Sequence, residues 1–494
     1  MALGGLDIGT SGCKCTIMTA DGELLAASYL EYAASRTSGA HQIDPNTIWN
    51  AVKSVIADAA KQSREKMTAL CVTSFGESCA LLDEQDQPLA PILLYTDPRG
   101  QEQCDALIEH LGEQEIYRIC GHRPNPMYFL PKLMWYRDNQ PALYAKIRQV
   151  LPVHGYIVHQ LSGEYVTDLS MAARMMMLDV RRREWSKELL EAAGIPVELL
   201  PRLAETGEAV GTVRREIASE LGLSPELKVV IGCHDQVAAS IGAGAMRPGT
   251  AVNGSGTVEC ITPVFETIPE HPALFDGGFA MVPACGYYVT YAFIFTGGAL
   301  LQWYRDQFGA EAKALAKETG KGVYAVLDSQ VGADPSGLLV LPHFAGAATP
   351  YMNPLAKGAI CGLSVENTAA EIYRGMLEGI AYETRVNMER LEEAGIRIDS
   401  LRTTGGGGRS KTWVQIKADI LKRPIDTLTV DEAGTVGSIM LAGTAIGEYA
   451  SLEEAMSLTQ TKARYLPAED CARYDGIYDH YKRLYTALQA VYQG

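Results

Sequence analysis

The sequence predicts an α/β protein with two related halves, and three observations carry this prediction. A short loop that combines glycine with hydroxyl side chains occurs at residues 7–12 and again at residues 253–257. Strand-like and helix-like segments accompany each loop in a similar order, although the second copy is less regular. A chain of 494 residues is also too long for one hydrophobic core. We therefore expect one domain over residues 1–246 and another over residues 247–494.

The first half opens with three expected strands within residues 3–31. They are separated by turns at residues 9–12 and 20–23, the second of which contains a hairpin-type Asp-Gly pair. Apolar residues then recur at helical spacing between Ile48 and Ala59, and Asn46 is the candidate N-cap. Two further strands are expected at residues 70–73 and 79–82.

The second half repeats this order from about residue 250. Strands are expected at residues 252–262, 278–283 and 287–295, and a helix is expected from Leu300 onward. The boundary between the halves is expected within residues 243–250, where glycine, arginine and proline cluster.

A third glycine-rich loop, Gly405 to Gly408, lies between an expected strand and an expected helix around residues 413–420. Another helix is expected from Gly434 to Ala442. Backbone amides in glycine-rich turns and at helix N-termini bind anions such as phosphate. Three such loops in one chain indicate a nucleotide that is gripped between two related halves.

Composition disfavours several classes of protein. The formal net charge of −16 argues against a nucleic-acid surface, which usually needs a basic face, but not against a phosphate ligand. No apolar run reaches the roughly twenty residues of a membrane helix, and the N-terminus lacks a basic region followed by an apolar core. We therefore expect a cytoplasmic protein without nucleic-acid or membrane partners. A homodimer is compatible with the sequence.

The loop from Asp7 to Ser11 has the groups that a phosphate site needs. Neither a P-loop motif nor a complete dinucleotide-binding fingerprint occurs in the chain. The loop instead offers backbone amides, two hydroxyls and one carboxylate, and carboxylates are ligands of Mg²⁺. The alternative is an ordinary hairpin turn, which the loop taken alone does not exclude.

Asp235 is the acidic residue of the first half that is the candidate for a catalytic role. It follows the apolar run Val229 to Ile231 and precedes a helix of small residues. A carboxylate in this position can accept a proton from a substrate hydroxyl. The alternative is a helix cap, and from spacing alone the cap is favoured. No role is expected for His234.

These motifs together resemble those of the FGGY carbohydrate kinase family, and most closely its xylulokinase branch. The resemblance extends from Leu3 to about Tyr449. Residues 6–11 with Lys14 are similar to the family's first phosphate loop, and Gly256-Thr257 is similar to its second. Further similar segments are residues 127–139 (departing at Phe129), 298–306, 358–378 (departing at Gly375) and 405–419.

The resemblance implies two actin-like, ribonuclease H-like domains with a deep cleft between them. It also implies ATP- and Mg²⁺-dependent phosphorylation, with Asp235 as the catalytic base and Asp7 as the metal ligand. The implied nucleotide and phosphate contacts are Gly9, Thr10, Ser11, Lys14, Gly256, Thr257, Gly298, Gln302, Gly406, Gly407 and Ser410.

The substrate side departs from the xylulokinase pattern. Gly76-Glu77 stands where xylulokinases have a Met-His pair, and only Glu77 matches the Arg-Glu pair of glycerol kinases. A carboxylate there favours a neutral polyol over gluconate. Arg99 is a candidate cation for an acidic sugar, with a structural ion pair to Asp97 as the alternative. The implied substrate contacts are Gly76, Glu77, Gln236 and Arg99.

The expected function is therefore the ATP-dependent phosphorylation of a small carbohydrate, first of all a ketopentose such as D-xylulose. Another ketose, a glycerol-like polyol or gluconate are the alternative substrates. An actin-like sugar sensor without turnover is the alternative of another class. An actin-like chaperone or cytoskeletal protein is disfavoured by the carboxylates Asp235 and Glu77 on the substrate side.

Overall fold

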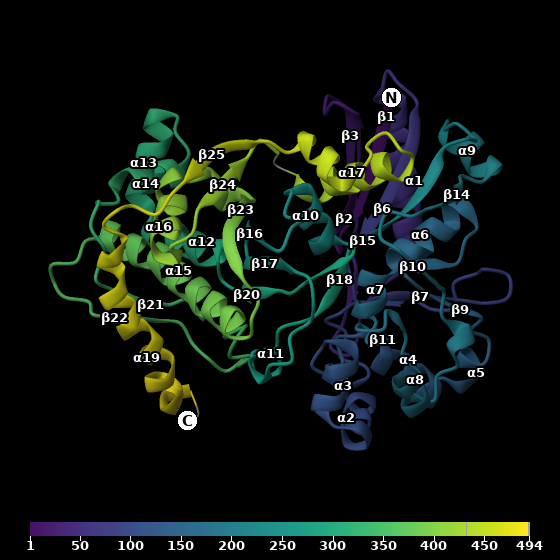
Figure 1. Cartoon of the computed structure of the whole chain (residues 1–494), viewed down its shortest axis with the longest axis horizontal. Helices are drawn as coiled ribbons and strands as arrows, with labels where there is room; N and C mark the ends of the chain where they lie inside the picture. Colours follow the sequence, from purple (N-terminus) through teal and green to yellow (C-terminus); the bar gives the residue numbers. More distant parts are fainter. Residues whose placement is uncertain (431, 493–494) are drawn as a thin grey trace. The chain divides into compact units, whose positions relative to one another are not determined.

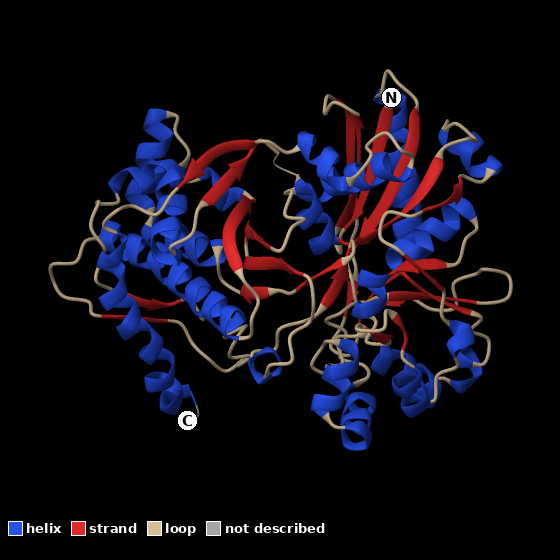
Figure 2. Cartoon of the chain, in the orientation of Figure 1, coloured by secondary structure: helices blue, strands red, loops and turns tan. Residues whose placement is uncertain are grey.

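A computed structural model describes residues 1–430 and 432–492, which form two compact units. The first unit contains residues 1–246 together with two later segments, 280–289 and 432–459. The second unit contains residues 247–279, the described part of 290–431, and 460–492. Each unit has a central sheet with helices packed around it (Figures 1 and 2).

The sheet of the first unit has the strand order β14-β15-β6-β1-β2-β3. Strands β1, β2 and β3 form an antiparallel meander, β6 and β15 lie parallel to β1, and β14 is antiparallel at the edge. The bounds are β1 Ala2–Ile8, β2 Gly12–Thr19, β3 Leu24–Glu31, β6 Met67–Ser74, β14 Ala209–Thr212 and β15 Lys228–His234. The three expected N-terminal strands are confirmed.

The sheet of the second unit repeats this order and these strand directions. Its strands run β20-β17-β16-β23-β24-β25, with the same succession of antiparallel and parallel neighbours. The bounds are β16 Gly249–Ser255, β17 Glu259–Phe265, β20 Ala292–Ile294, β23 Ile398–Thr404, β24 Ile425–Leu428 and β25 Thr461–Tyr465. The internal duplication predicted from the repeated loops is thus confirmed at the level of topology.

Glycines let the helices of the first unit approach its sheet closely. Helix α17 (Ala433–Ala445) packs on β1 and β6. A Cβ on Gly5 of β1 would lie 2.6 Å from the Thr435 carbonyl oxygen of α17. Helix α10 (Asp235–Gly242) packs on α17, where a Cβ on Gly437 would lie 2.0 Å from the Ala238 carbonyl oxygen. This close packing brings the start of α10 and the end of β1 into one unit with α17.

The remaining helices of the first unit surround two apolar clusters. They are α1 Pro45–Gln62, α2 Gln101–Leu111, α3 Glu113–Cys120, α4 Phe129–Asn139, α5 Pro141–Tyr144, α6 Val153–Ser162, α7 Leu169–Arg174, α8 Lys187–Ala193, α9 Arg215–Leu221 and α18 Leu452–Ala455. Short strands form four separate ladders among the described residues of this unit: β4 Ser35–Arg36 with β5 His41–Ile43 and β8 Ile92–Leu93, β7 Cys79–Leu82 with β9 Gln149–Pro152, β10 Val166–Asp168 with β13 Arg202–Ala204, and β11 Leu178–Asp179 with β12 Glu184–Trp185. Strands β18 Val282–Ala284 and β19 Tyr287–Val289 form an antiparallel pair, which the strand order places beside β17.

The second unit has its own apolar core around the long helix α15 (Ala369–Glu393), which packs against α16 (Lys411–Leu421) and β20. The other elements are α11 Pro272–Asp276, α12 Gly298–Phe308, α13 Ala310–Thr319, α14 Val323–Gln330, α19 Asp475–Tyr492, β21 Leu339–Leu341 and β22 Ala359–Cys361. In the described part of the chain, no helix is long and apolar enough to cross a membrane.

Three expectations about local structure are corrected. The N-cap of α1 is Asp44, not Asn46, because the Asp44 carboxylate accepts a hydrogen bond from the Asn46 backbone amide at 2.8 Å. Residues 252–262 form the hairpin of β16 and β17 rather than one strand. Residues 287–295 form β19 and β20, which are assigned to different units.

Candidate active site

The first glycine-containing loop is the tip of the β1–β2 hairpin. The Gly9 amide donates to the Gly12 carbonyl oxygen at 2.8 Å, and the Tyr32 hydroxyl donates to the Gly9 carbonyl oxygen at 2.5 Å. Thr10 is half-buried and Ser11 is exposed, so both hydroxyls can reach a ligand. Lys14 lies opposite Asp7 on β2 and forms an ion pair with Glu432 at 3.1 Å. A contact between Lys14 and a phosphate, which the sequence predicts, would therefore have to compete with the ion pair to Glu432.

Asp7 is the penultimate residue of β1 and lies next to Gly434 at the start of α17. Burial, and then the charge of Glu432, raise the pKa of Asp7 to about 6, while Lys14 opposes this shift. A Cβ on Gly434 would lie 3.3 Å from Asp7 Oδ2, so the glycine keeps this side of the carboxylate open. Among the described residues, no group of three or more His, Cys, Asp or Glu is arranged to hold a metal. The open side of the Asp7 carboxylate nevertheless fits Mg²⁺, which proteins commonly bind through one or two carboxylates with water and substrate phosphate oxygens as the other ligands.

Asp235 is the first residue of α10, directly after β15. The N-cap position belongs to His234, so the alternative role of Asp235 as the cap is not what the structure shows. The side chain is 34% exposed, and its Oδ1 lies 3.2 Å from Nε2 of His234. Withdrawal from bulk water, and then the like charges of Asp7 and Glu77, raise the pKa of Asp235 to about 7. Burial lowers the pKa of His234 well below its usual value, so the imidazole is neutral.

Glu77 lies in the loop between β6 and β7 and is paired with an arginine that the sequence analysis missed. The carboxylate is buried and accepts hydrogen bonds from both Nε and Nη2 of Arg174, the last residue of α7. The Arg174 guanidinium also lies over the Tyr128 ring, 5.3 Å from its centroid. No local pattern reveals this pair, because its members are 97 residues apart in the chain.

The other expected substrate contacts are placed differently. Gly76 lies against the His234 ring, since a Cβ on Gly76 would be 3.0 Å from His234 Cδ2. Gln236 is exposed on the first turn of α10. Arg99 donates to both Asp97 oxygens, at 2.8 and 2.6 Å, and to Gln42 at 2.7 Å. These bonds support the alternative that Arg99 forms a structural ion pair with Asp97, and we therefore do not include Arg99 in the substrate site.

The raised pKa of Asp235 gives a prediction for the pH dependence of the reaction. A carboxylate accepts a proton only when it is ionised, so kcat/KM should fall as the pH drops through about 7. Arg174 lowers the pKa of Asp235, and Arg174→Met should therefore move the acidic limb to higher pH. A kcat/KM profile for both proteins checks this. An unchanged limb in the variant would separate Arg174 from the electrostatics of Asp235.

The second unit contains a cavity of about 580 Å³. All the nucleotide contacts expected in this half line it: Gly256, Thr257, Gly298, Gln302, Gly406, Gly407 and Ser410. They come from the β16–β17 turn, the start of α12 and the segment between β23 and α16. A volume of this size lies within the usual range for small-molecule sites.

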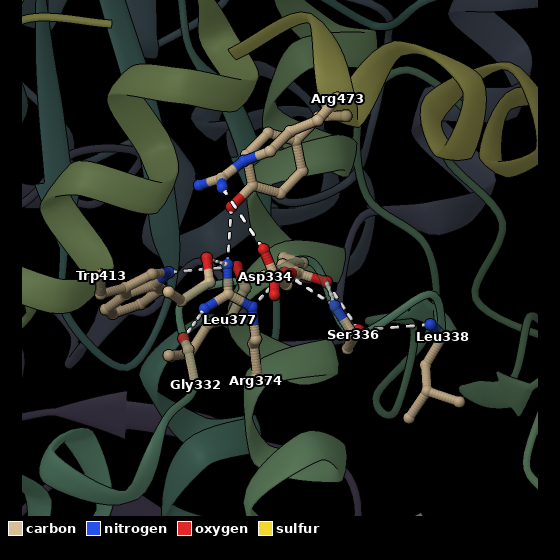
Figure 3. A network of polar contacts seen from close by, with 11 residues as sticks. Gly332, Asp334, Ser336, Leu338, Arg374, Leu377, Trp413 and Arg473 are labelled. Carbon is tan, nitrogen blue, oxygen red and sulfur yellow. Dashed lines mark hydrogen bonds and ion pairs between the residues drawn. The ribbon is translucent and has the colours of Figure 1, made fainter. Parts of the chain in front are cut away.

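The walls of this cavity are fastened to one another by backbone hydrogen bonds. The Gly298 amide donates to the Gly256 carbonyl oxygen at 2.8 Å, and the Ala299 amide donates to the Thr257 carbonyl oxygen at 3.1 Å. The start of α12 is thus fixed against the second loop. Another lining residue, Trp413, donates from its Nε1 to the Leu377 carbonyl oxygen of α15 at 3.2 Å (Figure 3).

The sequence analysis missed several residues of the cavity. Asp328 accepts a hydrogen bond from the Ser410 hydroxyl at 2.6 Å and another from the Tyr373 hydroxyl at 3.2 Å. Tyr324 and Trp413 add aromatic surface to the lining. Apolar and aromatic walls with a few placed polar groups are typical of small-molecule sites. Asp328 and Tyr324 lie on α14, which no motif marks in the sequence.

The two units share one topology. The first contains a carboxyl group with a raised pKa, Asp235, and the second contains a turn of glycine and hydroxyl residues that lines a cavity. These features are typical of a kinase that acts on small molecules. Comparison with known proteins identifies which. Residues 2–242 match the N-terminal domain and residues 256–446 the C-terminal domain of the FGGY family of carbohydrate kinases. The chain therefore belongs to this family and is a phosphotransferase.

Relatives within the family differ in the substrate that their names give. A xylulose kinase of Escherichia coli is 29% identical, over 98% of this chain and 98% of its own. A gluconokinase of Bacillus subtilis is also 29% identical, over 95% of this chain and 92% of its own. The crystal structure of a xylulose kinase from Rhodospirillum rubrum has a TM-score of 0.90 at 26% identity and covers 100% of both chains. The two-domain fold is thus shown.

Proposed function

We propose that this carbohydrate kinase transfers the γ-phosphoryl group of ATP to a hydroxyl of a small ketose, first of all a ketopentose such as D-xylulose. The observation that best supports this type of reaction is the carboxyl group of Asp235. It is partly accessible, lies at the start of α10, and has a pKa that is raised to about 7. A group with this pKa is ionised often enough at neutral pH to accept a proton and basic enough to take it.

In the proposed mechanism the protein acts mainly by positioning. Asp235 accepts the proton of the substrate hydroxyl, and His234 restricts the orientation of its carboxylate. The amides and hydroxyls of the β1–β2 turn and of the β16–β17 turn bind phosphate oxygens, while the cavity of the second unit holds the nucleoside. Family members are ATP-dependent kinases that generally use Mg²⁺. When bound at Asp7, Mg²⁺ supplies positive charge for the phosphate oxygens.

The Glu77–Arg174 pair bears on the choice of sugar. A lone buried carboxylate would repel an aldonate, but Glu77 is compensated by a guanidinium that donates to it twice. Arg174 thereby favours gluconate as the second candidate substrate, because an arginine beside the sugar can also receive a carboxylate. We keep the ketose as the first candidate because xylulose kinases are among the most similar relatives along the whole chain.

Glu77→Gln should weaken sugar binding about ten- to a hundredfold and leave ATP affinity unchanged. The variant removes the charge that fixes Arg174 and one acceptor for a sugar hydroxyl, and a lost partner in a buried polar site costs about 1–3 kcal/mol. The measurement is KM for the sugar and for ATP in the wild type and the variant. A charge-neutral control is Glu109→Gln, an exposed position of α2. An unchanged sugar KM in Glu77→Gln would remove Glu77 from the substrate site.

A further inference from the structure

A buried cluster of charges lies directly behind one wall of the cavity in the second unit. Glu259 begins β17 and Lys417 lies on α16, and the two form an ion pair in which each side chain is 1% exposed. Asn253 and Ser255, both on β16, complete the cluster and are also buried. The sequence analysis placed Asn253 and Ser255 in the second glycine-containing loop, but it named none of these four residues as a ligand contact.

The hydrogen bonds of the cluster converge on Ser255, which lines the cavity. The Ser255 hydroxyl donates to Glu259 Oε2 at 2.7 Å and accepts from Lys417 Nζ at 2.9 Å. Lys417 also donates to Asn253 Oδ1 at 3.2 Å, while Asn253 Nδ2 donates to Glu259 Oε1 at 2.6 Å. All three ammonium hydrogens of Lys417 thus have acceptors, and Ser255 is held by both charges.

The cluster contacts two side chains that line the cavity, Ser255 and Trp413. A Cβ on Gly407 would lie 2.1 Å from Ser255 Oγ and 2.6 Å from Trp413 Cζ3, so the glycine run packs tightly into a corner made by these two side chains. The Lys417 ammonium lies 3.8 Å from the centroid of the Trp413 ring. Lys417 therefore contacts both side chains that form the corner.

We propose that Glu259 and Lys417 are a positioning pair for the nucleotide: they hold Ser255 and Trp413 in the arrangement that shapes the cavity. The inference rests on the proposed function, in which this cavity binds ATP. A buried ion pair contributes little to stability compared with an apolar pair of similar volume. Stability alone therefore gives no reason for two charges here, whereas a fixed hydroxyl beside the phosphate loop does.

The test compares Lys417→Met with the double variant Lys417→Met/Glu259→Leu. The single variant leaves an uncompensated buried carboxylate and should lower the melting temperature and raise the Kd for ATP about tenfold or more. The double variant should recover the melting temperature but not the ATP affinity, because Ser255 lacks both partners. The sugar KM should stay within about twofold in both. Calorimetric ATP titration, thermal unfolding and steady-state kinetics give the three readouts.

Two further variants make the result decisive if Lys417→Met fails to fold. Ser255→Ala keeps both charges and their ion pair and removes the hydroxyl that they share, so it should raise the Kd for ATP. Because it leaves one Lys417 hydrogen and one Glu259 oxygen without the Ser255 partner, it should also lower the melting temperature, but less than Lys417→Met does. Arg385→Met removes another largely buried cation, one bound to Glu389 and Asp475 away from the cavity, and should leave the Kd unchanged.

Recovery of both stability and ATP affinity in the double variant would overturn the inference and leave the pair with a structural role only. Normal ATP affinity in Ser255→Ala would overturn it as well. Gly406→Val distinguishes this outcome from an error in the proposed nucleotide site, because its side chain would lie in the cavity itself. If Gly406→Val also left ATP binding unchanged, the cavity would not be the nucleotide site.

Discussion

Asp235→Asn should lower sugar-dependent turnover roughly 10²–10⁴-fold, which is the usual contribution of a positioned general base. Asparagine has nearly the same shape but cannot accept the proton. The carboxyl is only partly enclosed, with 34% of the side chain exposed, so the fold should tolerate the change. Steady-state kinetics with saturating ATP and sugar give the effect, and calorimetric titration should show an ATP Kd close to that of the wild type.

Asp58→Asn is the matched control for this variant. It makes the same chemical change at an exposed position of α1 and should leave turnover unchanged. Near-normal turnover in Asp235→Asn would show that another group takes the substrate proton, and the role of Asp235 in the mechanism would be wrong.

Gly406→Val should raise the Kd for ATP about tenfold or more while changing the melting temperature little. Gly406 lines the cavity, and a Cβ there would have no protein atom within 4 Å. The new side chain would thus occupy ligand space, and overfilling a packed site typically costs about 1–3 kcal/mol. Since about 1.4 kcal/mol corresponds to a factor of ten in affinity, calorimetric titration resolves the effect.

A substitution at Gly406 tests ATP binding more directly than one at Gly407 or Gly298, because only at Gly406 does an added Cβ meet open space. Gly407 and Gly298 are among the nucleotide contacts expected from the sequence, so valine at either position would be expected to fill the ligand space. Instead, a Cβ on Gly407 would clash with Ser255 and Trp413, and a Cβ on Gly298 would lie 2.4 Å from the Gly256 carbonyl oxygen. Both changes would disturb the walls and hence the fold. Gly39→Val is the matched control, because its Cβ also meets open space but lies in the other unit. Unchanged ATP affinity in Gly406→Val would remove the glycine run from the nucleotide site.

The parts of the fold that the sequence predicts well depend on short-range patterns. The β1–β2–β3 meander follows from alternating apolar residues and a hairpin-type turn, and α1 follows from its helical spacing. The repeat of this order in the second half predicted the duplication. The choice of Asp44 over Asn46 as the cap shows the limit of such reasoning, because both residue types can fill that position.

The parts that the sequence could not give depend on long-range packing. Helix α17 belongs to the first unit because Gly5 and Gly437 allow close approach to β1 and α10, which no local pattern reveals. The compensation of Glu77 by Arg174 joins residues that are 97 positions apart, and it changes the argument about acidic sugars. The Glu259–Lys417 pair joins residues 158 positions apart and is equally invisible before folding.

A coupled assay of ADP release with Mg-ATP, run over ketopentoses, other ketoses, alditols and aldonates on the wild type and Asp235→Asn, tests the central claim most directly. The account predicts ADP release that requires a sugar, is fastest with a ketopentose and falls roughly 10²–10⁴-fold in the variant. Gluconate as clearly the best substrate would overturn the ketose assignment and select the Arg174-based alternative. No sugar-dependent release from the wild type, or equal release from both proteins, would contradict the proposed mechanism itself.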